Sequence, residues 1–194
     1  MKTNVTLKLG DRTVLTNDDG YYEFLNLTPG DYNVVETQPA DYCDGIDTAG
    51  TAGGTANNPG DSITSITLGS GTNAQQYNFG EYVPARLSGY VYADDDDNDG
   101  VRDAGEVPIA GVLITLVDAA GVPTGKTATT DANGYYEFAR ICPRTVGVVE
   151  THPAAYVDGK DTVGSVGGTA NNPGDSITQI ELRSGTNAMN YNFG

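Results

Sequence analysis

The chain has 194 residues, enough for one or two domains that each bury a hydrophobic core of their own. Its 26 acidic residues outnumber its 10 Lys and Arg, which gives a formal net charge of -16. A chain this acidic repels phosphate groups and attracts cations. We therefore expect no nucleic-acid partner and no binding to anionic membrane surfaces.

The composition favours short strands over helices. The chain contains 26 Gly and 9 Pro, and such frequent turn residues interrupt long helices. No apolar run approaches the ~18 residues of a membrane span, and residues 1–15 lack the apolar segment of a secretion signal. Two cysteines are too few for a disulfide scaffold. The composition thus predicts an all-β chain without membrane insertion.

The sequence contains an internal duplication. Residues 17–80 align without a gap on residues 131–194, and 41 of these 64 positions are identical, including the run GGTANNPGDSIT. The segment from Ser88 to Gly111 has no counterpart in the first copy. We predict a truncated repeat over 1–80 that lacks the opening strand, a linker over 81–87, and a complete repeat over 88–194.

Alternating apolar residues predict strands in both copies. In chain order, a turn over 17–20 precedes the run YNVVE, which places Tyr32, Val34 and Glu36 on one face. In the second copy the runs VLITLV (112–117) and SITQIEL (176–182) alternate in the same way. About seven short strands per ~110 residues, separated by turns, are typical of an immunoglobulin-like Greek-key sandwich of two antiparallel sheets.

The segment DDDNDGVRDAGE, residues 95–106, has the spacing of a calcium-binding loop. Positions 1, 3, 5, 9 and 12 carry carboxylates, position 6 is a glycine that permits a sharp turn, and position 7 offers a carbonyl oxygen. The predicted Ca²⁺ ligands are Asp95, Asp97, Asp99, Val101, Asp103 and Glu106. Strand-like runs flank the loop instead of helices, so we expect a structural ion and not a sensor. The first copy has no such loop.

Two smaller acidic turns could complete additional ion sites. One contains Asp131 and Asn133, and the other contains Asp158 and Asp161. Asx-turns of this kind are also common in hairpins that bind no ion. The sequence leaves both interpretations open.

The order of motifs resembles the B-type repeat of the serine-aspartate repeat (Sdr) surface adhesins, within the wider collagen-adhesin B-type superfamily. The motifs are SGYVYADDDDNDGVRDAGEVPIAGV, TTDANGYYEF, VVETHPAAYVDGKDTVGSVGG and NYNFG. The resemblance covers the second copy and the first copy from about residue 5. It implies a prealbumin-like Greek-key β-sandwich that binds calcium and serves as a rigid spacer, usually in tandem arrays, at a bacterial cell surface or outside the cell.

Some members of the wider superfamily form a Lys–Asn isopeptide bond promoted by a buried Glu. Glu36 and Glu150 lie on the apolar faces of their strands, but the opening run LSGYVYA contains no Lys. We therefore expect no isopeptide bond and expect Asn192 to point outward. The two Glu side chains should lie at the margin of the core and be satisfied by hydrogen bonds.

The sequence offers no recognisable catalytic arrangement. His152 is the only histidine, and the first copy has Gln38 at its place, so we expect a surface residue at the end of a strand. Nothing in the sequence fixes two carboxylates as an acid and base pair. We expect a protein that is not an enzyme.

Three classes of function remain. The first is a calcium-stabilised spacer or stalk of a surface or extracellular protein. The second is an extracellular fibre subunit joined to other chains by strand pairing, and the third is a ligand-binding adhesion module. The expected partners are neighbouring repeats or copies of the chain itself, and the sequence names no ligand.

Overall fold

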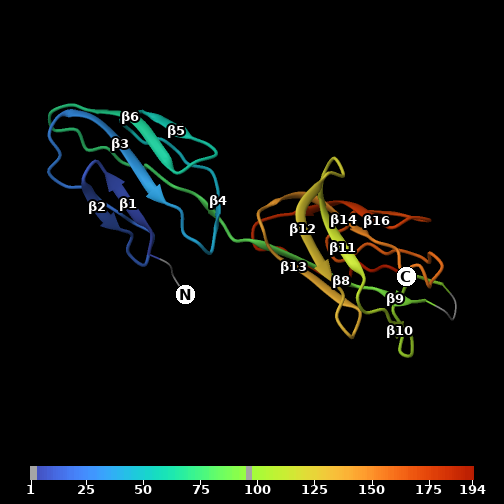
Figure 1. Ribbon diagram of the computed structural model, residues 1–194. Coiled ribbons are helices and arrows are strands. Elements are labelled where there is room, and N and C mark those ends of the chain that lie inside the picture. Colours follow the sequence, from blue (N-terminus) through green and yellow to red (C-terminus); the bar gives the residue numbers. More distant parts are fainter. Residues whose placement is uncertain (1–3, 95–97) are drawn as a thin grey trace. The chain divides into compact units, whose positions relative to one another are not determined.

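The computed structural model describes residues 4–94 and 98–194, and this part of the chain contains 17 short strands and no helix (Figure 1). The chain divides into two compact units, Met1–Val83 and Pro84–Gly194, called unit 1 and unit 2 here. The all-β class expected from the sequence is confirmed. No helix in the described residues is long and apolar enough to cross a membrane.

Unit 2 is built from two main sheets. Its strands are β8 (Ala85–Tyr90), β9 (Tyr92–Ala93), β10 (Val107–Pro108), β11 (Leu113–Asp118), β12 (Pro123–Thr129), β13 (Tyr135–Ile141), β14 (Arg144–Glu150), β15 (Thr169–Asn171), β16 (Ser176–Leu182) and β17 (Asn187–Ala188). The larger sheet has the order β12-β11-β14-β16-β15 and is antiparallel. The smaller has the order β13-β8-β17, in which β17 runs parallel to β8. Strands β9 and β10 form a separate pair.

The core of unit 2 lies where the apolar faces of the two main sheets meet. The alternation expected in residues 112–117 is confirmed, since Val112, Ile114 and Leu116 are buried. They share one cluster with Leu87 of β8 and Phe138 of β13, on the other sheet. This arrangement is the expected sandwich, with one hydrophobic face of each sheet turned inward.

Asn192, near the C-terminus, differs from the expectation that it points outward. Its side chain is buried, and its Oδ1 atom accepts a hydrogen bond of 3.0 Å from the amide of Tyr90. Its neighbours Tyr191 and Phe193 are also buried, as expected. The alternation rule fails here because Asn192 lies outside a regular ladder and bonds to the backbone of β8.

Gly89 marks the closest approach between the opening strand of unit 2 and its surroundings. A Cβ atom at this position would lie 1.7 Å from the main-chain oxygen of Tyr191 and 3.0 Å from the ring of Tyr136. Such a distance to backbone is not compatible with a side chain. Strand β8 can therefore occupy its place only with glycine at this position.

Unit 1 repeats the larger sheet of unit 2. Its strands are β1 (Thr6–Leu9), β2 (Arg12–Leu15), β3 (Gly30–Thr37), β4 (Cys43–Asp44), β5 (Thr55–Asn57), β6 (Ser62–Leu68) and β7 (Glu81–Tyr82). The main sheet has the order β2-β1-β3-β6-β5, which matches β12-β11-β14-β16-β15 strand for strand. Strands β4 and β7 form a small antiparallel pair. The segment 81–87, expected as a linker, contains β7 and the first residues of β8.

The described residues of unit 1 contain no equivalent of the β13-β8-β17 sheet. Residues 21–27 correspond to β13 in sequence but form no strand. Tyr22 and Phe24 are only half-buried, whereas Tyr136 and Phe138 at the same positions of unit 2 are 1% and 4% exposed. One layer of unit 1 is therefore incompletely covered.

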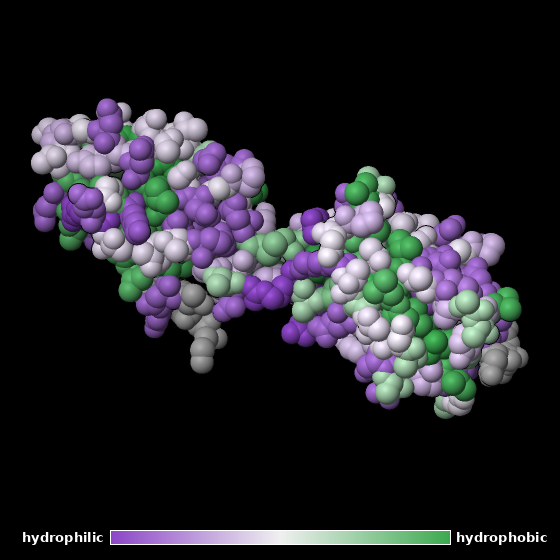
Figure 2. Space-filling view, viewed as in Figure 1, coloured by the Kyte–Doolittle hydropathy of each residue, from purple (hydrophilic) through white to green (hydrophobic). Residues whose placement is uncertain are grey.

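Figure 2 shows hydrophilic and hydrophobic residues side by side on the visible face of each unit.

Gly89→Ala should destabilise unit 2 by roughly 1–3 kcal/mol or more, because the added methyl group would collide with the Tyr191 backbone. Gly30→Ala in β3 is the matched control, since its Cβ would have only Tyr32 nearby, at 3.9 Å, and should change stability by no more than about 1 kcal/mol. The measurement is hydrogen exchange of the β14 and β16 amides in the full chain. Equal protection in the two variants would contradict the close approach.

Candidate metal centre

The predicted calcium loop connects two paired strands. Strand β9 ends just before it and β10 begins just after it, and their pairing places Ala93 opposite Val107. Of the six predicted ligands, Asp95 and Asp97 lie outside the described residues. The other four, Asp99, Val101, Asp103 and Glu106, lie in the described part of the loop.

Backbone amides donate hydrogen bonds to two of the described carboxylates of the loop, Asp99 and Glu106. The amide of Val101 donates a hydrogen bond of 2.6 Å to Asp99 Oδ1, and that of Asp103 donates one of 2.7 Å to Glu106 Oε2. Glu106, at the last ligand position, is buried with 8% of its surface exposed. The loop thus turns its closing carboxylate inward, as a ligand at position 12 requires.

The loop is fastened to the chain near residue 161. The ammonium group of Lys160 donates a hydrogen bond of 2.7 Å to the carbonyl of Asp99. Gly100 has a φ of 80°, and a Cβ atom there would lie 2.7 Å from the side chain of Thr162. Both its backbone conformation and its crowded position call for the glycine that the sequence has at position 6.

Buried oxygen atoms lie beside the loop. The Tyr92 hydroxyl is buried and has no hydrogen-bond partner among the described residues, and the same holds for Asp94 Oδ1. The other oxygen, Asp94 Oδ2, accepts a bond of 2.8 Å from the amide of Gly100. Burial, followed by the charges of Asp94 and Glu106, raises the pKa of Tyr92. Polar atoms left without a partner are costly, so this region is suited to a further polar or charged group.

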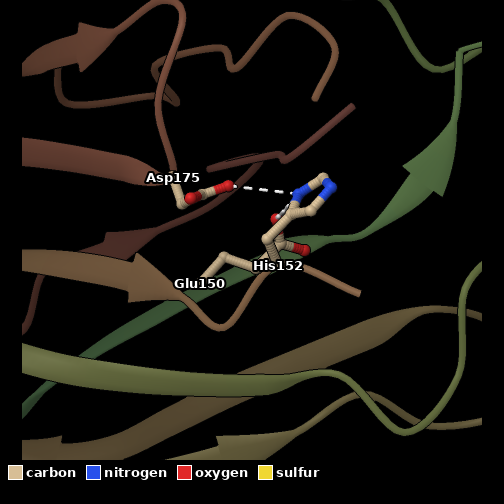
Figure 3. Close-up of side chains that lie close together, drawn as sticks. All are labelled: Glu150, His152 and Asp175. Atoms are coloured by element: carbon tan, nitrogen blue, oxygen red, sulfur yellow. Dashed lines mark ion pairs between the residues drawn. The ribbon is translucent and has the colours of Figure 1, made fainter. Parts of the chain in front are cut away.

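A cavity of about 270 Å³ lies next to Tyr92 and Asp94, and Glu150 and His152 also line it. Glu150 is the last residue of β14, and Asp175 immediately precedes β16. Figure 3 shows the Asp175 carboxylate turned toward the His152 ring, with Glu150 beside them. His152 Nδ1 lies 3.2 Å from Asp175 Oδ1 and 4.0 Å from Glu150 Oε2. These three residues could hold a metal ion.

Asp161 adds a further buried carboxylate to this group, which we call the carboxylate cluster of unit 2: Glu150, Asp158, Asp161 and Asp175. Asp161 is 3% exposed, and its Oδ2 atom has no hydrogen-bond partner among the described residues. Burial and then Glu150 raise the pKa of Asp161 to about 8. Burial and then Asp175 raise the pKa of Glu150 to about 7, although His152 opposes the shift.

Unit 1 contains a corresponding cluster of Glu36, Asp44, Asp47 and Asp61. Burial, followed by the charge of Glu81, raises the pKa of Glu36 to about 8. In both units an asparagine side chain forms two hydrogen bonds with the main chain of the buried aspartate. Asn58 accepts one of 2.7 Å from the Asp47 amide and donates one of 2.9 Å to the Asp47 carbonyl. Asn172 forms the same two bonds with Asp161, at the same distances. The cluster is therefore a feature of the repeat itself.

Sequence reasoning singled out Glu150, Asp158 and Asp161, but neither Asp175 nor the meeting of these residues. The expectation that Glu150 would be satisfied by hydrogen bonds is wrong, because its Oε1 atom is buried without a partner in the described structure. His152 lies at the end of a strand as expected, but it pairs with Asp175, which the sequence analysis did not single out. The identical run GGTANNPGDSIT, which contains Asp175, was the available signal.

The two smaller acidic turns have different structures. Asp131 Oδ1 accepts hydrogen bonds from the amides of Asn133 and Tyr135 at 2.8 and 2.9 Å, the pattern of an Asx-turn. Asn17 Oδ1 does the same in unit 1 with the amides of Asp19 and Tyr21. The Asp131 carboxylate thus stabilises the turn of the hairpin, whereas Asp161 of the other turn belongs to the carboxylate cluster.

The fold and these sites define a class of protein, a β-sheet repeat present in two copies, of which the second is a β-sandwich that carries an acidic loop between two strands. The family model named SdrD B-like domain matches residues 85–194. Because this match covers more than half of the chain, the chain belongs to that family, and the resemblance seen in the sequence is confirmed. Membership places the chain at the cell surface or outside the cell.

Similar proteins extend the match over both units. Serine-aspartate repeat-containing protein F of Staphylococcus epidermidis is 31% identical in an alignment of 172 positions, which covers 84% of this chain and 9% of the relative. Serine-aspartate repeat-containing protein D of Staphylococcus aureus (strain Newman) is 34% identical in an alignment of 172 positions, which covers 83% of this chain and 12% of the relative. The chain spans about a tenth of the length of these relatives.

A solved structure, GBS52, the minor pilin of Streptococcus agalactiae, aligns with 100% of this chain and 83% of its own. The sequence identity is 11% and the TM-score is 0.35. A likeness this loose carries no argument about function.

Without divalent cations, the free energy of unfolding should fall as the pH rises from about 5 to 8. The folded-state pKa values of Glu150 and Asp161 are raised to about 7 and about 8, so the folded chain holds protons that the unfolded chain releases. The stability is present below the unfolded pKa of about 4 and is lost as the pH passes through the folded values.

The measurement is urea unfolding of the full chain in calcium-free buffer at several pH values, followed by tyrosine fluorescence. Asp161→Asn should flatten the pH dependence, because the amide does not titrate. Glu181→Gln, an exposed partner of Arg183, is the control and should leave the slope unchanged. A stability that rises with pH over this range would rule out the raised pKa values.

Proposed function

We propose that the chain is a calcium-stabilised structural repeat that acts as a rigid spacer in a surface protein and has no enzymatic activity. The observation that carries the proposal is the loop of residues 95–106, where a complete calcium spacing ends in the buried Glu106. An ion bound there would tie the connection between β9 and β10 to the edge of the core.

The donor atoms of the described residues fit a calcium ion. Asp99, Asp103 and Glu106 supply carboxylate oxygens and Val101 a carbonyl, which are the hard ligands that calcium prefers. The buried Asp94 Oδ1 atom beside the loop has no hydrogen-bond partner in the described structure. A cation would relieve both the repulsion between these carboxylates and the cost of that buried oxygen.

The spacer role is supported by the duplication and by the family. Both units contain the same five-stranded sheet, as expected for repeats placed in series. The matched relatives are serine-aspartate repeat-containing proteins about ten times longer than this chain, so a repeat of this kind would occupy a small part of such a protein.

The carboxylate clusters support a structural role and not catalysis. Unit 1 has Gln38 where unit 2 has His152, while the buried Glu and Asp residues are the same in both units. Gln38 donates a hydrogen bond of 2.7 Å to Glu81, and a neutral amide cannot replace an imidazole as an acid or base. The two units thus share the buried carboxylates but not the histidine.

Calcium at about 100 times its dissociation constant should add ~2.7 kcal/mol to the free energy of unfolding of unit 2. Calorimetry of the full chain in calcium and in EDTA measures the shift in melting temperature. Glu106→Gln should remove most of it, because the variant loses the charge at the closing ligand position. Glu137→Gln, which disrupts an exposed ion pair with Arg86, is the control and should retain the shift.

An unchanged melting temperature in calcium would refute the calcium site. A shift that Glu106→Gln leaves intact but Asp161→Asn abolishes would place the ion in the carboxylate cluster and refute the loop.

Unit 1 favours one alternative, a fibre subunit joined to other chains by strand pairing, because its described residues form no second sheet. Sedimentation velocity separates the two functions. A spacer should remain a monomer of 20.2 kDa with and without calcium, whereas a fibre subunit should form larger species as its concentration rises.

A further inference from the structure

Among its described residues, unit 1 has a large groove where unit 2 has its second sheet, and both apolar and polar residues line it. The groove has a volume of about 1020 Å³ and runs between residues 21–27 and residues 74–79. Buried side chains of β1, β3 and β6 line it, including Leu7, Val34 and Ile66. Tyr21 and Leu25 at its margin are 60% and 56% exposed. Apolar area of this kind is normally covered by a partner.

Unit 2 shows which element covers the corresponding surface. Strand β8 lies between β13 and β17, with Leu87 opposite Phe138 on one side and Ala188 on the other. Its residues Ala85 and Leu87 are fully buried, and Val91, which follows it, is 2% exposed. A single extended strand is therefore enough to complete the second layer.

The residues that contact β8 in unit 2 recur in unit 1. Their counterparts, all of identical type, are Tyr22 for Tyr136, Phe24 for Phe138, Ala74 for Ala188, Tyr77 for Tyr191 and Phe79 for Phe193. The Tyr22 hydroxyl donates a hydrogen bond of 2.7 Å to the Tyr77 carbonyl, and Tyr136 bonds to Tyr191 at the same distance. The hydrogen bond that joins the two sides of the groove is thus already formed as it is around β8.

The backbone of the groove also has room for a strand. In unit 2 the amides of Tyr191 and Phe193 donate to the carbonyls of Ser88 and Tyr90, at 3.2 and 2.9 Å. In unit 1 the corresponding amides, of Tyr77 and Phe79, have no backbone acceptor among the described residues. An added strand would supply these acceptors, as in strand addition to an open sheet edge.

We propose that the groove of unit 1 is an acceptor site for the opening strand of another repeat of this type. The occupant has the chemistry of β8 and the residue that follows it, with Ala, Leu, Gly and Val at alternate positions. The proposal goes beyond the calcium-stabilised spacer and does not depend on it.

Glycine in the occupant is the specificity determinant of this site. In unit 2, a Cβ at Gly89 would collide with the Tyr191 main-chain oxygen and press on the Tyr136 ring. Tyr77 and Tyr22 take these places in unit 1, joined by the same hydrogen bond. A strand with the right apolar pattern but a branched residue at this position should therefore be excluded.

The test uses the full chain and a synthetic peptide of residues 84–93, PARLSGYVYA, with binding followed by titration calorimetry. We expect one peptide bound per chain and slower amide hydrogen exchange at residues 21–27 and 74–79. A peptide with Val in place of the glycine should bind about ten- to a hundredfold more weakly. This comparison changes only the peptide, so it does not depend on the folding of a variant chain.

Two variants of the chain locate the site. Phe24→Asp places a charge in the groove and should abolish binding, whereas Val35→Asp, on the exposed face of β3, should leave it unchanged. Equal binding of the two peptides, or protection that appears only in unit 2, would overturn the proposal. Chains that form dimers which the peptide does not dissociate would overturn it as well, because a second copy would then cover the groove by another contact.

Discussion

The structure depends on the burial of one strand between two others. In unit 2, β8 completes the second layer of the sandwich by pairing with β13 and β17. Unit 1 keeps the aromatic residues of that layer, yet residues 21–27 form no strand among the described residues, and Tyr22 and Phe24 are left half-buried. Local sequence cannot explain the difference, since YYEF is the same in both units. The second sheet forms only when the opening strand is present, because the other strands of that sheet then have a partner for backbone hydrogen bonds.

The segment that supplies this strand also supplies the acidic loop, since β8, β9 and the loop follow one another within residues 85–106. The carboxylate clusters are independent of it, because unit 1 has the buried Glu36 and Asp47 without a loop. Each cluster brings together groups that repel one another in a poorly solvated place, which raises their pKa values. Such clusters reduce stability at neutral pH unless protons or cations neutralise them, and both units contain one.

The sequence predicted the elements that follow from periodicity and self-comparison. Residues 112–117 point their apolar side chains inward because alternation in a strand is a local rule. The burial of Asn192 and the pairing of His152 with Asp175 could not be predicted in this way. Each depends on a contact between residues that are far apart in the chain and meet at the ends of strands. The segment 81–87 was predicted as a linker because it lies between the two copies, and self-comparison could not show that it contains β7 and the first residues of β8. The calcium spacing could be identified directly, because a loop carries its ligands in consecutive positions.

The parallel pairing of β17 with β8 has a mechanical consequence. These are the last and the first strands of unit 2, and they lie side by side with Asn187 opposite Arg86. A force that pulls the two ends of the unit apart would load the backbone hydrogen bonds between β8 and β17 in shear. These hydrogen bonds would then bear the force together and would not break one after another. A spacer under tension at a cell wall would hold longest with this arrangement, since lifetime under load is set by the rate of unfolding. In unit 1 the same clamp would exist only while a strand occupies the groove.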